Sequence, residues 1–125
     1  MNIFGIFTGH HDYSASAVSA ALSIIGSQND YRCLSNRGRD INSMYSDIEE
    51  IIKSSDSDHF FVFIDFYGSS FSIPATRIKD NFNKKITLLF GYNLPVIVDF
   101  FLHRPNKTPK ELYDKLVSIG KEAIS

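Results

Sequence analysis

The stretch 3-IFGIFTGHHDY-13 decides the fold of this chain. Its apolar residues run without alternation as far as Thr8, as expected for a strand that helices cover on both faces. Two histidines, His10 and His11, then stand where a helix should begin. In an open α/β sheet, ligands and chemistry gather at such a turn, outside the carboxyl ends of the strands. We therefore expect His10 to enter a pocket that the rest of the chain completes.

Length and composition are those of one ordinary globular domain. The 125 residues can bury a continuous core, and 43% hydrophobic against 22% charged residues argues against a disordered chain. The net charge is -1, and the lysines and arginines are scattered rather than gathered on one face. This pattern argues against a nucleic-acid-binding surface. We assign residues 1–125 to a single domain, with a core rich in phenylalanine because the chain has 11 of them and no tryptophan.

Cysteine usage and apolar runs indicate the compartment. Cys33 is the only cysteine, so neither an intrachain disulfide nor a thiolate metal cluster can form, and we expect a plain buried thiol. The first residues lack a basic segment followed by a cleavable apolar stretch. No apolar run approaches the roughly 20 residues that a membrane helix needs. We therefore expect a cytoplasmic protein with no direct membrane insertion.

Apolar runs alternate with amphipathic segments along the whole chain. The runs predict strands over residues 2–8, 31–35, 59–66 and 85–92. The amphipathic segments predict helices over 14–25, from a cap at Asn42 or Ser43 to about 54, around 72–81, from near Pro95, and after a Thr108–Glu111 capping box.

This alternation predicts a doubly wound α/β domain. Strands joined by helices form a parallel sheet with crossovers of one hand, and helices then cover both faces. We expect a mainly parallel four-stranded sheet with strand order 2-1-3-4. The run 59–66, HFFVFIDF, is the most apolar of the four and should be central.

That strand order brings three turns to one edge of the sheet: residues 8–11, 65–70 and 91–93. Strands one and three are neighbours, which places His10 beside Asp65. A carboxylate can accept a hydrogen bond from one imidazole nitrogen, fix the tautomer and leave the other nitrogen as a nucleophile. Ser69 and Ser70 precede a helix N-terminus, which favours anions. A phosphoryl group on His10 would suit this environment.

Each of these residues also has a plainer interpretation. A histidine at a strand end is usually solvated, Asp65 is as often a turn or cap residue, and Gly68-Ser69-Ser70 is commonly only a turn. A serine triad is disfavoured because the chain has no G-x-S-x-G elbow.

A metal site is also disfavoured. His10 and His11 are adjacent and cannot easily face one ion, while His59 and His103 lie at the opposite ends of their predicted elements. We expect neither a metal nor a bound cofactor.

Taken together, the motifs resemble the enzyme IIA component of the mannose family of the bacterial phosphoenolpyruvate-dependent sugar phosphotransferase system. The first is 8-TGHH-11, where the family has T-G-H-G or T-H-G. The second, 64-IDFYGSSFSIPA-75, corresponds to V-D-x-x-G-G-S-P-F-N-x-A, and the third, 91-GYNLP-95, matches G-x-N-L-P. The terminal helix pattern 119-IGKE-122 is also similar, so the resemblance covers nearly the whole chain.

The resemblance implies a phosphoryl carrier. His10 would accept phosphate from the phosphohistidine of the general carrier HPr and pass it to a IIB domain, with the membrane components IIC and IID involved only indirectly. Asp65 would orient the imidazole. The phosphate-binding residues implied are Thr8, Gly9, Gly68, Ser69 and Ser70.

The resemblance also implies a homodimer in which a short antiparallel C-terminal strand is exchanged between subunits. Because the sequence ends at Ile124-Ser125, we expect this strand to be very short or missing.

Several positions depart from the family pattern. His11 and Ser69 replace glycines, and Phe71, Ser72 and Ile73 replace Pro-Phe-Asn. These changes fit either a divergent sugar branch or a paralogue with inefficient transfer, and they leave open whether His11 competes as acceptor. They also leave two alternatives: a degenerate IIA-like regulatory or binding module, and the phosphoryl-donor subunit of a dihydroxyacetone kinase system. The sugar is not encoded in these residues.

Overall fold

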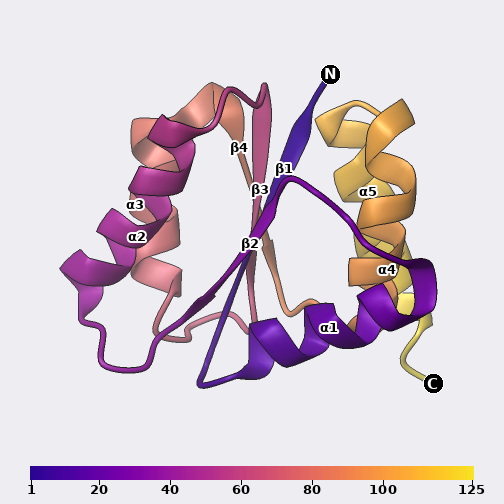
Figure 1. Ribbon diagram of the computed structural model, residues 1–125, viewed down its shortest axis with the longest axis horizontal. Helices are drawn as coiled ribbons and strands as arrows, with labels where there is room; N and C mark the ends of the chain where they lie inside the picture. The colour runs from indigo at the N-terminus through magenta and orange to yellow at the C-terminus, as the bar shows by residue number, and fades with distance from the viewer.

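The computed structural model describes residues 1–125 and contains one parallel sheet of four strands (Figure 1). The strands are β1 (Ile3–Gly9), β2 (Tyr31–Ser35), β3 (His59–Ile64) and β4 (Ile86–Phe90). All three strand pairs are parallel and the order is β2-β1-β3-β4. The predicted fold class and strand order are confirmed. No strand follows the last helix (Pro109–Glu122), in agreement with the expectation that the C-terminal antiparallel strand would be very short or missing.

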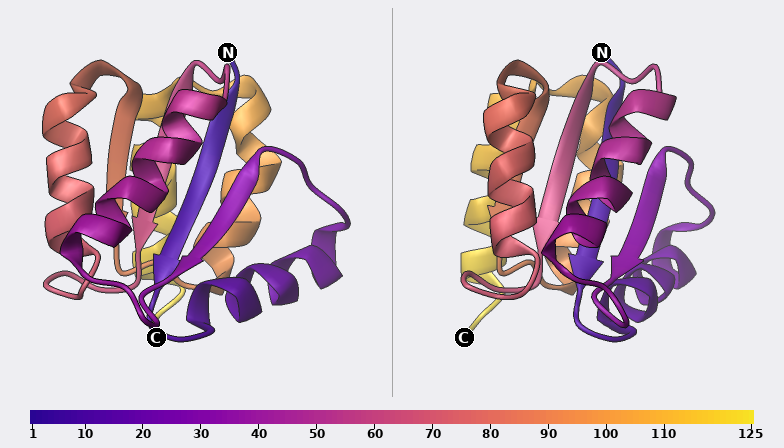
Figure 2. Two further views of the ribbon diagram at one scale, coloured as in Figure 1. Left: turned by 60° about the vertical axis from the view of Figure 1, so that its left-hand side comes forward. Right: turned by 90° about the vertical axis from the view of Figure 1, so that its left-hand side faces the viewer.

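Five α-helices cover the sheet. They are α1 (Tyr13–Ile25), α2 (Ile41–Ser54), α3 (Ser72–Asn81), α4 (Leu94–His103) and α5 (Pro109–Glu122), with two 3₁₀ turns, η1 (Asn83–Lys85) and η2 (Arg104–Asn106). The α2–α3 pair packs on one face, and α1, α4 and α5 cover the other (Figures 1 and 2). None of these helices is both long and apolar enough to cross a bilayer.

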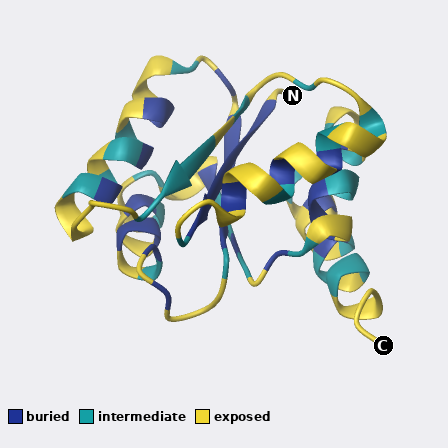
Figure 3. Ribbon diagram, turned by 60° about the horizontal axis from the view of Figure 1, so that its bottom comes forward, coloured by how far each residue is buried: buried dark blue, intermediate teal, exposed yellow.

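The side chains of β1 and β3 alternate between two cores, one on each face of the sheet. Phe7, Phe61 and Phe63 point into the core beneath α1, α4 and α5. Phe4 and Phe60 point into the core beneath α2 and α3. Every residue of β1 and β3 is buried, and Figure 3 shows these strands as the buried centre of the molecule. The predicted phenylalanine-rich core is confirmed, and it holds both strand ends in fixed positions.

The caps of two helices agree with the sequence pattern, and the cap of a third differs from the predicted one. Thr108 and Glu111 form the predicted reciprocal capping box of α5, and Asn93 caps α4 with Pro95 in the first turn. The predicted cap of α2 at Asn42 or Ser43 is wrong. Asp40 has the extended backbone of a cap, and its carboxylate accepts from the Ser43 N–H at 2.8 Å, so the helix begins earlier.

The carboxyl end of β3 also differs from the prediction, which extended the strand to Phe66. Pairing stops at Ile64, whose carbonyl accepts from the Gly91 N–H at 2.8 Å. Asp65 and Phe66 therefore leave the sheet and are free to face the turn that follows β1.

Candidate active site

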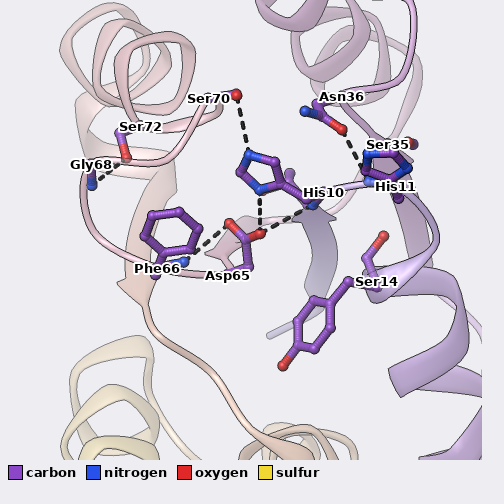
Figure 4. Close-up of polar contacts among 12 residues, drawn as sticks. His10, His11, Ser14, Ser35, Asn36, Asp65, Phe66, Gly68, Ser70 and Ser72 are labelled. Carbon is purple, nitrogen blue, oxygen red and sulfur yellow. Dashed lines mark hydrogen bonds and ion pairs between the residues drawn. The ribbon is translucent and has the colours of Figure 1, made fainter.

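The site lies at the carboxyl edge of the sheet, between the ends of its two central strands. Phe7 of β1 is paired with Phe63 of β3. His10 and Asp65 come two or three residues further along these parallel strands, so both lie at the same edge of the sheet. Their side chains point toward each other from the two turns (Figure 4). The contact expected from strand order is present.

Two hydrogen bonds join His10 to Asp65. The Nδ1 of His10 lies 2.7 Å from Oδ2 of Asp65, and the backbone N–H of His10 donates to the same oxygen at 3.1 Å. A carboxylate can only accept, so Nδ1 carries the proton and Nε2 keeps its lone pair. The His10 side chain is 38% exposed and that of Asp65 10% exposed, so Nε2 can meet a reactant while the carboxylate is shielded.

Hydrogen bonds keep Asp65 charged. Burial raises the pKa of its carboxyl, but hydrogen bonds from the His10 ring and the His10 backbone outweigh burial and hold the pKa below its usual range. The backbone N–H of Phe66 donates to the other oxygen, Oδ1, at 3.0 Å. Both carboxylate oxygens are therefore fixed, and with them the plane in which Asp65 meets the imidazole.

A hydroxyl from the turn before α3 lies beside Nε2 of His10. The hydroxyl of Ser70 lies 3.3 Å from Nε2. The backbone N–H groups of Ser70 and Phe71 donate to no protein acceptor, and they precede the N-terminus of α3, which has no side-chain cap. Gly68 makes this turn with φ of 89°, a conformation that favours glycine, and its N–H donates to Ser72 Oγ at 2.9 Å. The turn therefore combines a hydroxyl beside Nε2 with unpaired N–H groups at a helix N-terminus, a combination that favours an anion.

The other predicted phosphate-binding residues have different surroundings. The Thr8 hydroxyl is buried and donates to the Phe63 carbonyl at 2.8 Å, so this side chain joins β1 to β3. The carbonyl of Gly9 accepts from Asn36 N–H at 3.2 Å. The Ser69 hydroxyl is buried and makes no hydrogen bond of good geometry. Contact of these three residues with phosphate remains a prediction.

His11 turns away from the His10–Asp65 pair (Figure 4). Its backbone N–H donates to the side chain of Asn36 at 3.0 Å, and its Nδ1 lies 3.0 Å from Nη2 of Arg37. A guanidinium only donates, so Nδ1 of His11 is the acceptor and the proton of the neutral ring sits on Nε2. The φ of His11 is 51°, in the left-handed region that favours glycine.

Aromatic residues at the strand ends support the site, and sequence reasoning missed them. Phe66 stacks on the His10 ring. The Tyr92 hydroxyl donates to the Thr8 carbonyl at 2.9 Å, and the Tyr13 hydroxyl donates to the Tyr92 carbonyl at 3.0 Å. Burial raises the pKa of both tyrosines, with the charge of Asp65 acting in the same direction, so their hydroxyls remain donors. The third predicted turn, residues 91–93, therefore contributes support through Tyr92 rather than a group near Nε2.

This arrangement suits nucleophilic chemistry at an imidazole. One nitrogen of His10 is protonated and anchored, and the other is accessible and faces a hydroxyl at a helix N-terminus. Such a nitrogen can take up an electrophilic group whose negative oxygens the turn would stabilise.

Comparisons with known proteins were made for both the sequence and the fold. A family model described as "PTS system fructose IIA component" matches residues 6–117. A search of curated protein sequences gave no significant match.

Solved structures share the fold. Phosphotransferase system component EIIA from Streptococcus agalactiae superposes with a TM-score of 0.91 at 21% identity, covering 98% of this chain and 95% of that one. A mannose/sorbose-specific IIA subunit from Enterococcus faecalis gives 0.79 at 16% identity, with coverage of 100% and 94%. A sigma-54 interaction domain protein from Enterococcus faecalis gives 0.79 at 10% identity, with coverage of 98% and 93%. At these identities the similarity establishes the fold alone.

Proposed function

This chain belongs to the family of PTS system fructose IIA components, and on that premise we propose that it carries a phosphoryl group on Nε2 of His10. One observation carries the proposal: Nδ1 of His10 is held by Asp65 at 2.7 Å, while Nε2 lies 3.3 Å from the hydroxyl of Ser70 in the turn before α3. A residue with this geometry is ready to accept a phosphoryl group and to release it again.

The transfer step balances as an exchange between two imidazoles. The lone pair on Nε2 of His10 attacks phosphorus and forms a new N–P bond. The N–P bond of the donor phosphohistidine breaks, and its electron pair returns to the donor's nitrogen. The proton stays on Nδ1 of His10, hydrogen-bonded to Asp65, throughout the transfer, so no proton has to leave the site. The reverse of this step, with a second partner, regenerates free His10.

The turn from Gly68 to Phe71 supplies the electrostatic part of catalysis. In the proposed phosphorylated state, the Ser70 hydroxyl turns from Nε2 to a phosphoryl oxygen, and the N–H groups of Ser70 and Phe71 donate to the same group. The charge on Asp65 is balanced by the partial positive charge of the Nδ1–H bond, which limits its repulsion of the phosphoryl group.

The partners follow from the family as further parts of the proposal. The donor is the phosphohistidine carrier HPr and the acceptor is a IIB component, so that the relay serves sugar uptake by a membrane transporter. We place this relay in the cytoplasm, and we propose a homodimer as the working form.

Intact-mass measurement after incubation with phosphoenolpyruvate, enzyme I and HPr tests the function. Wild type and His11→Ala should each gain one acid-labile phosphoryl group, whereas His10→Ala should gain none. Retention by His11→Ala is expected because Arg37 and Asn36 hold His11 away from Asp65. Phosphate on His10→Ala but not on His11→Ala would contradict the proposal, because it would identify His11 as the acceptor.

A regulatory or binding module is the second candidate, and the structural similarity to a sigma-54 interaction domain protein favours keeping it in view. The same mass measurement separates the two. No phosphate on wild type, with a competent IIA protein phosphorylated in parallel, would reject the carrier and leave the binding module.

A further inference from the structure

Phe66 makes two contacts with the His10–Asp65 pair. Its backbone N–H donates to Oδ1 of Asp65 at 3.0 Å. Its ring stacks on the imidazole of His10, with the ring centroids 5.5 Å apart and the ring planes 16° from parallel. Figure 4 shows the phenyl ring beside the imidazole. One residue thus contacts both members of the pair.

The position of this ring is not explained by the hydrophobic core. Phe66 belongs to neither core cluster, and 53% of its surface is exposed. Its neighbour Tyr67 is 82% exposed and packs on Phe90 instead, with ring centroids 5.2 Å apart. Of the two adjacent aromatic residues, only Phe66 is stacked against the imidazole of His10.

We infer that Phe66 is a positioning residue that holds the plane of the His10 imidazole, and so the direction in which Nε2 points. The hydrogen bond to Asp65 fixes the ring at Nδ1, which leaves the ring free to tilt about that contact. A flat apolar surface parallel to the imidazole opposes the tilt. A phenyl ring also offers no hydrogen bond, so it does not compete for the lone pair of Nε2.

Orientation matters for transfer between two imidazoles because the attacking and leaving nitrogens have to be in line with phosphorus. Functional groups generally need to be held within about 10–20° of the productive geometry. This consequence rests on the proposed carrier function, whereas the positioning itself is a property of the unphosphorylated protein.

Nuclear magnetic resonance of the unphosphorylated protein tests the positioning directly. We expect contacts between the Phe66 and His10 ring protons and a ring-current shift on the carbon-bound protons of His10. Phe66→Tyr should keep both, and Phe66→Ala and Phe66→Leu should lose the ring-current shift. The ring-nitrogen signals should still report the Nδ1–H tautomer in every Phe66 variant, because Asp65 sets it. Leu102→Ala, at a position of similar exposure (51%) on α4, serves as the matched control and should leave His10 unchanged.

Kinetics of phosphoryl uptake from phospho-HPr then measure the consequence. Phe66→Ala should lower kcat by about 10-fold, below the roughly 100-fold that a 1 Å misplacement can cost, with little change in KM. Phe66→Tyr should restore the rate. Failure of the carrier function and failure of the positioning can be told apart. Absence of phosphate on wild type rejects the carrier function, whereas the resonance data decide the positioning by themselves.

Two results would overturn the inference. The first is a His10 spectrum in Phe66→Ala identical to that of wild type, which would mean that the stack does not persist in solution. The second is a raised KM at unchanged kcat, which would assign Phe66 to partner docking instead.

Discussion

Two histidines lie at opposite ends of the central strands, and their environments differ in every respect that matters for chemistry. His10 follows β1 at the carboxyl edge, is partly exposed and is paired with a carboxylate. His59 begins β3 at the amino edge, is 7% exposed, and places Nε2 2.7 Å from the Thr87 hydroxyl. Burial lowers the pKa of His59, and the charge of Lys79 acts in the same direction.

His10 and His59 are the same residue type, so their different environments come from the end of the strand at which each one lies. At the carboxyl edge the chain turns into helices, so His10 lies 3.3 Å from the Ser70 hydroxyl in the turn before α3. At the amino edge the chain enters the sheet, and the His59 N–H donates to the Asn2 carbonyl at 3.2 Å. Burial favours a neutral, structural His59, whereas the carboxyl edge leaves a ring nitrogen of His10 available to a reactant.

The sharpest way to break the contrast is Asp65→Asn, which removes the anchoring carboxylate. Asparagine cannot accept from the Nδ1–H, the His10 backbone and Phe66 as a carboxylate does, so the tautomer is released and the ring loses its anchor at Nδ1. We expect phosphoryl uptake from phospho-HPr to slow by about 10²–10⁴-fold, the range over which loss of a tautomer-fixing carboxylate acts elsewhere. Rapid-quench measurement of uptake gives the rate.

A matched control exists at α4, where Asp99 lies 3.5 Å from His103 in another carboxylate–histidine pair. Asp99→Asn should leave the rate within about twofold of wild type, since surface ion pairs contribute little. Equal losses in the two variants would point to a general effect of charge rather than to the site.

A smaller effect is expected from Ser70→Ala, which removes the hydroxyl 3.3 Å from Nε2 but leaves His10 and Asp65 in place. A hydrogen bond to a charged group contributes about 1.5–3 kcal/mol, so we expect uptake to slow by about 10–100-fold. Ser118→Ala, an exposed serine of α5, controls for the loss of a hydroxyl and should have no effect. A Ser70→Ala rate equal to that of wild type would leave the backbone N–H groups as the only phosphate donors.

The smallest effect concerns His59 and appears in stability rather than activity. Because its folded pKa is depressed below 6.5, stabilisation by neutral His59 is fully present above pH 6.5 and is lost as the pH falls through the folded pKa. Urea unfolding between pH 8 and pH 5 should show this loss in wild type. His59→Gln should remove most of this pH dependence while phosphoryl uptake stays unchanged. Parallel stability curves for the two proteins would contradict the assignment.

Much of the fold could be predicted because its signals are local. Continuous apolar runs, helical spacing and the Thr108 capping box predicted the four strands, their order and the last helix, all of which agree with the structure. The cap of α2 was misplaced because Asp40, Asn42 and Ser43 are all good cap residues, and only the backbone conformation selects Asp40. Strand order also predicted that His10 and Asp65 would be neighbours.

The sequence by itself therefore determined the class of fold, the edge at which chemistry gathers and the pair of residues at its centre. Only the tertiary structure decided that Phe66 stacks on His10, that Arg37 holds His11 away, and that the Thr8 hydroxyl is used inside the sheet. The physical reason is the distance along the chain over which each effect acts. Periodicity and turn preference act over a few residues, whereas side chains such as those of His10 and Ser70, 60 positions apart, meet only when strand register and rotamers are set together by the packed core.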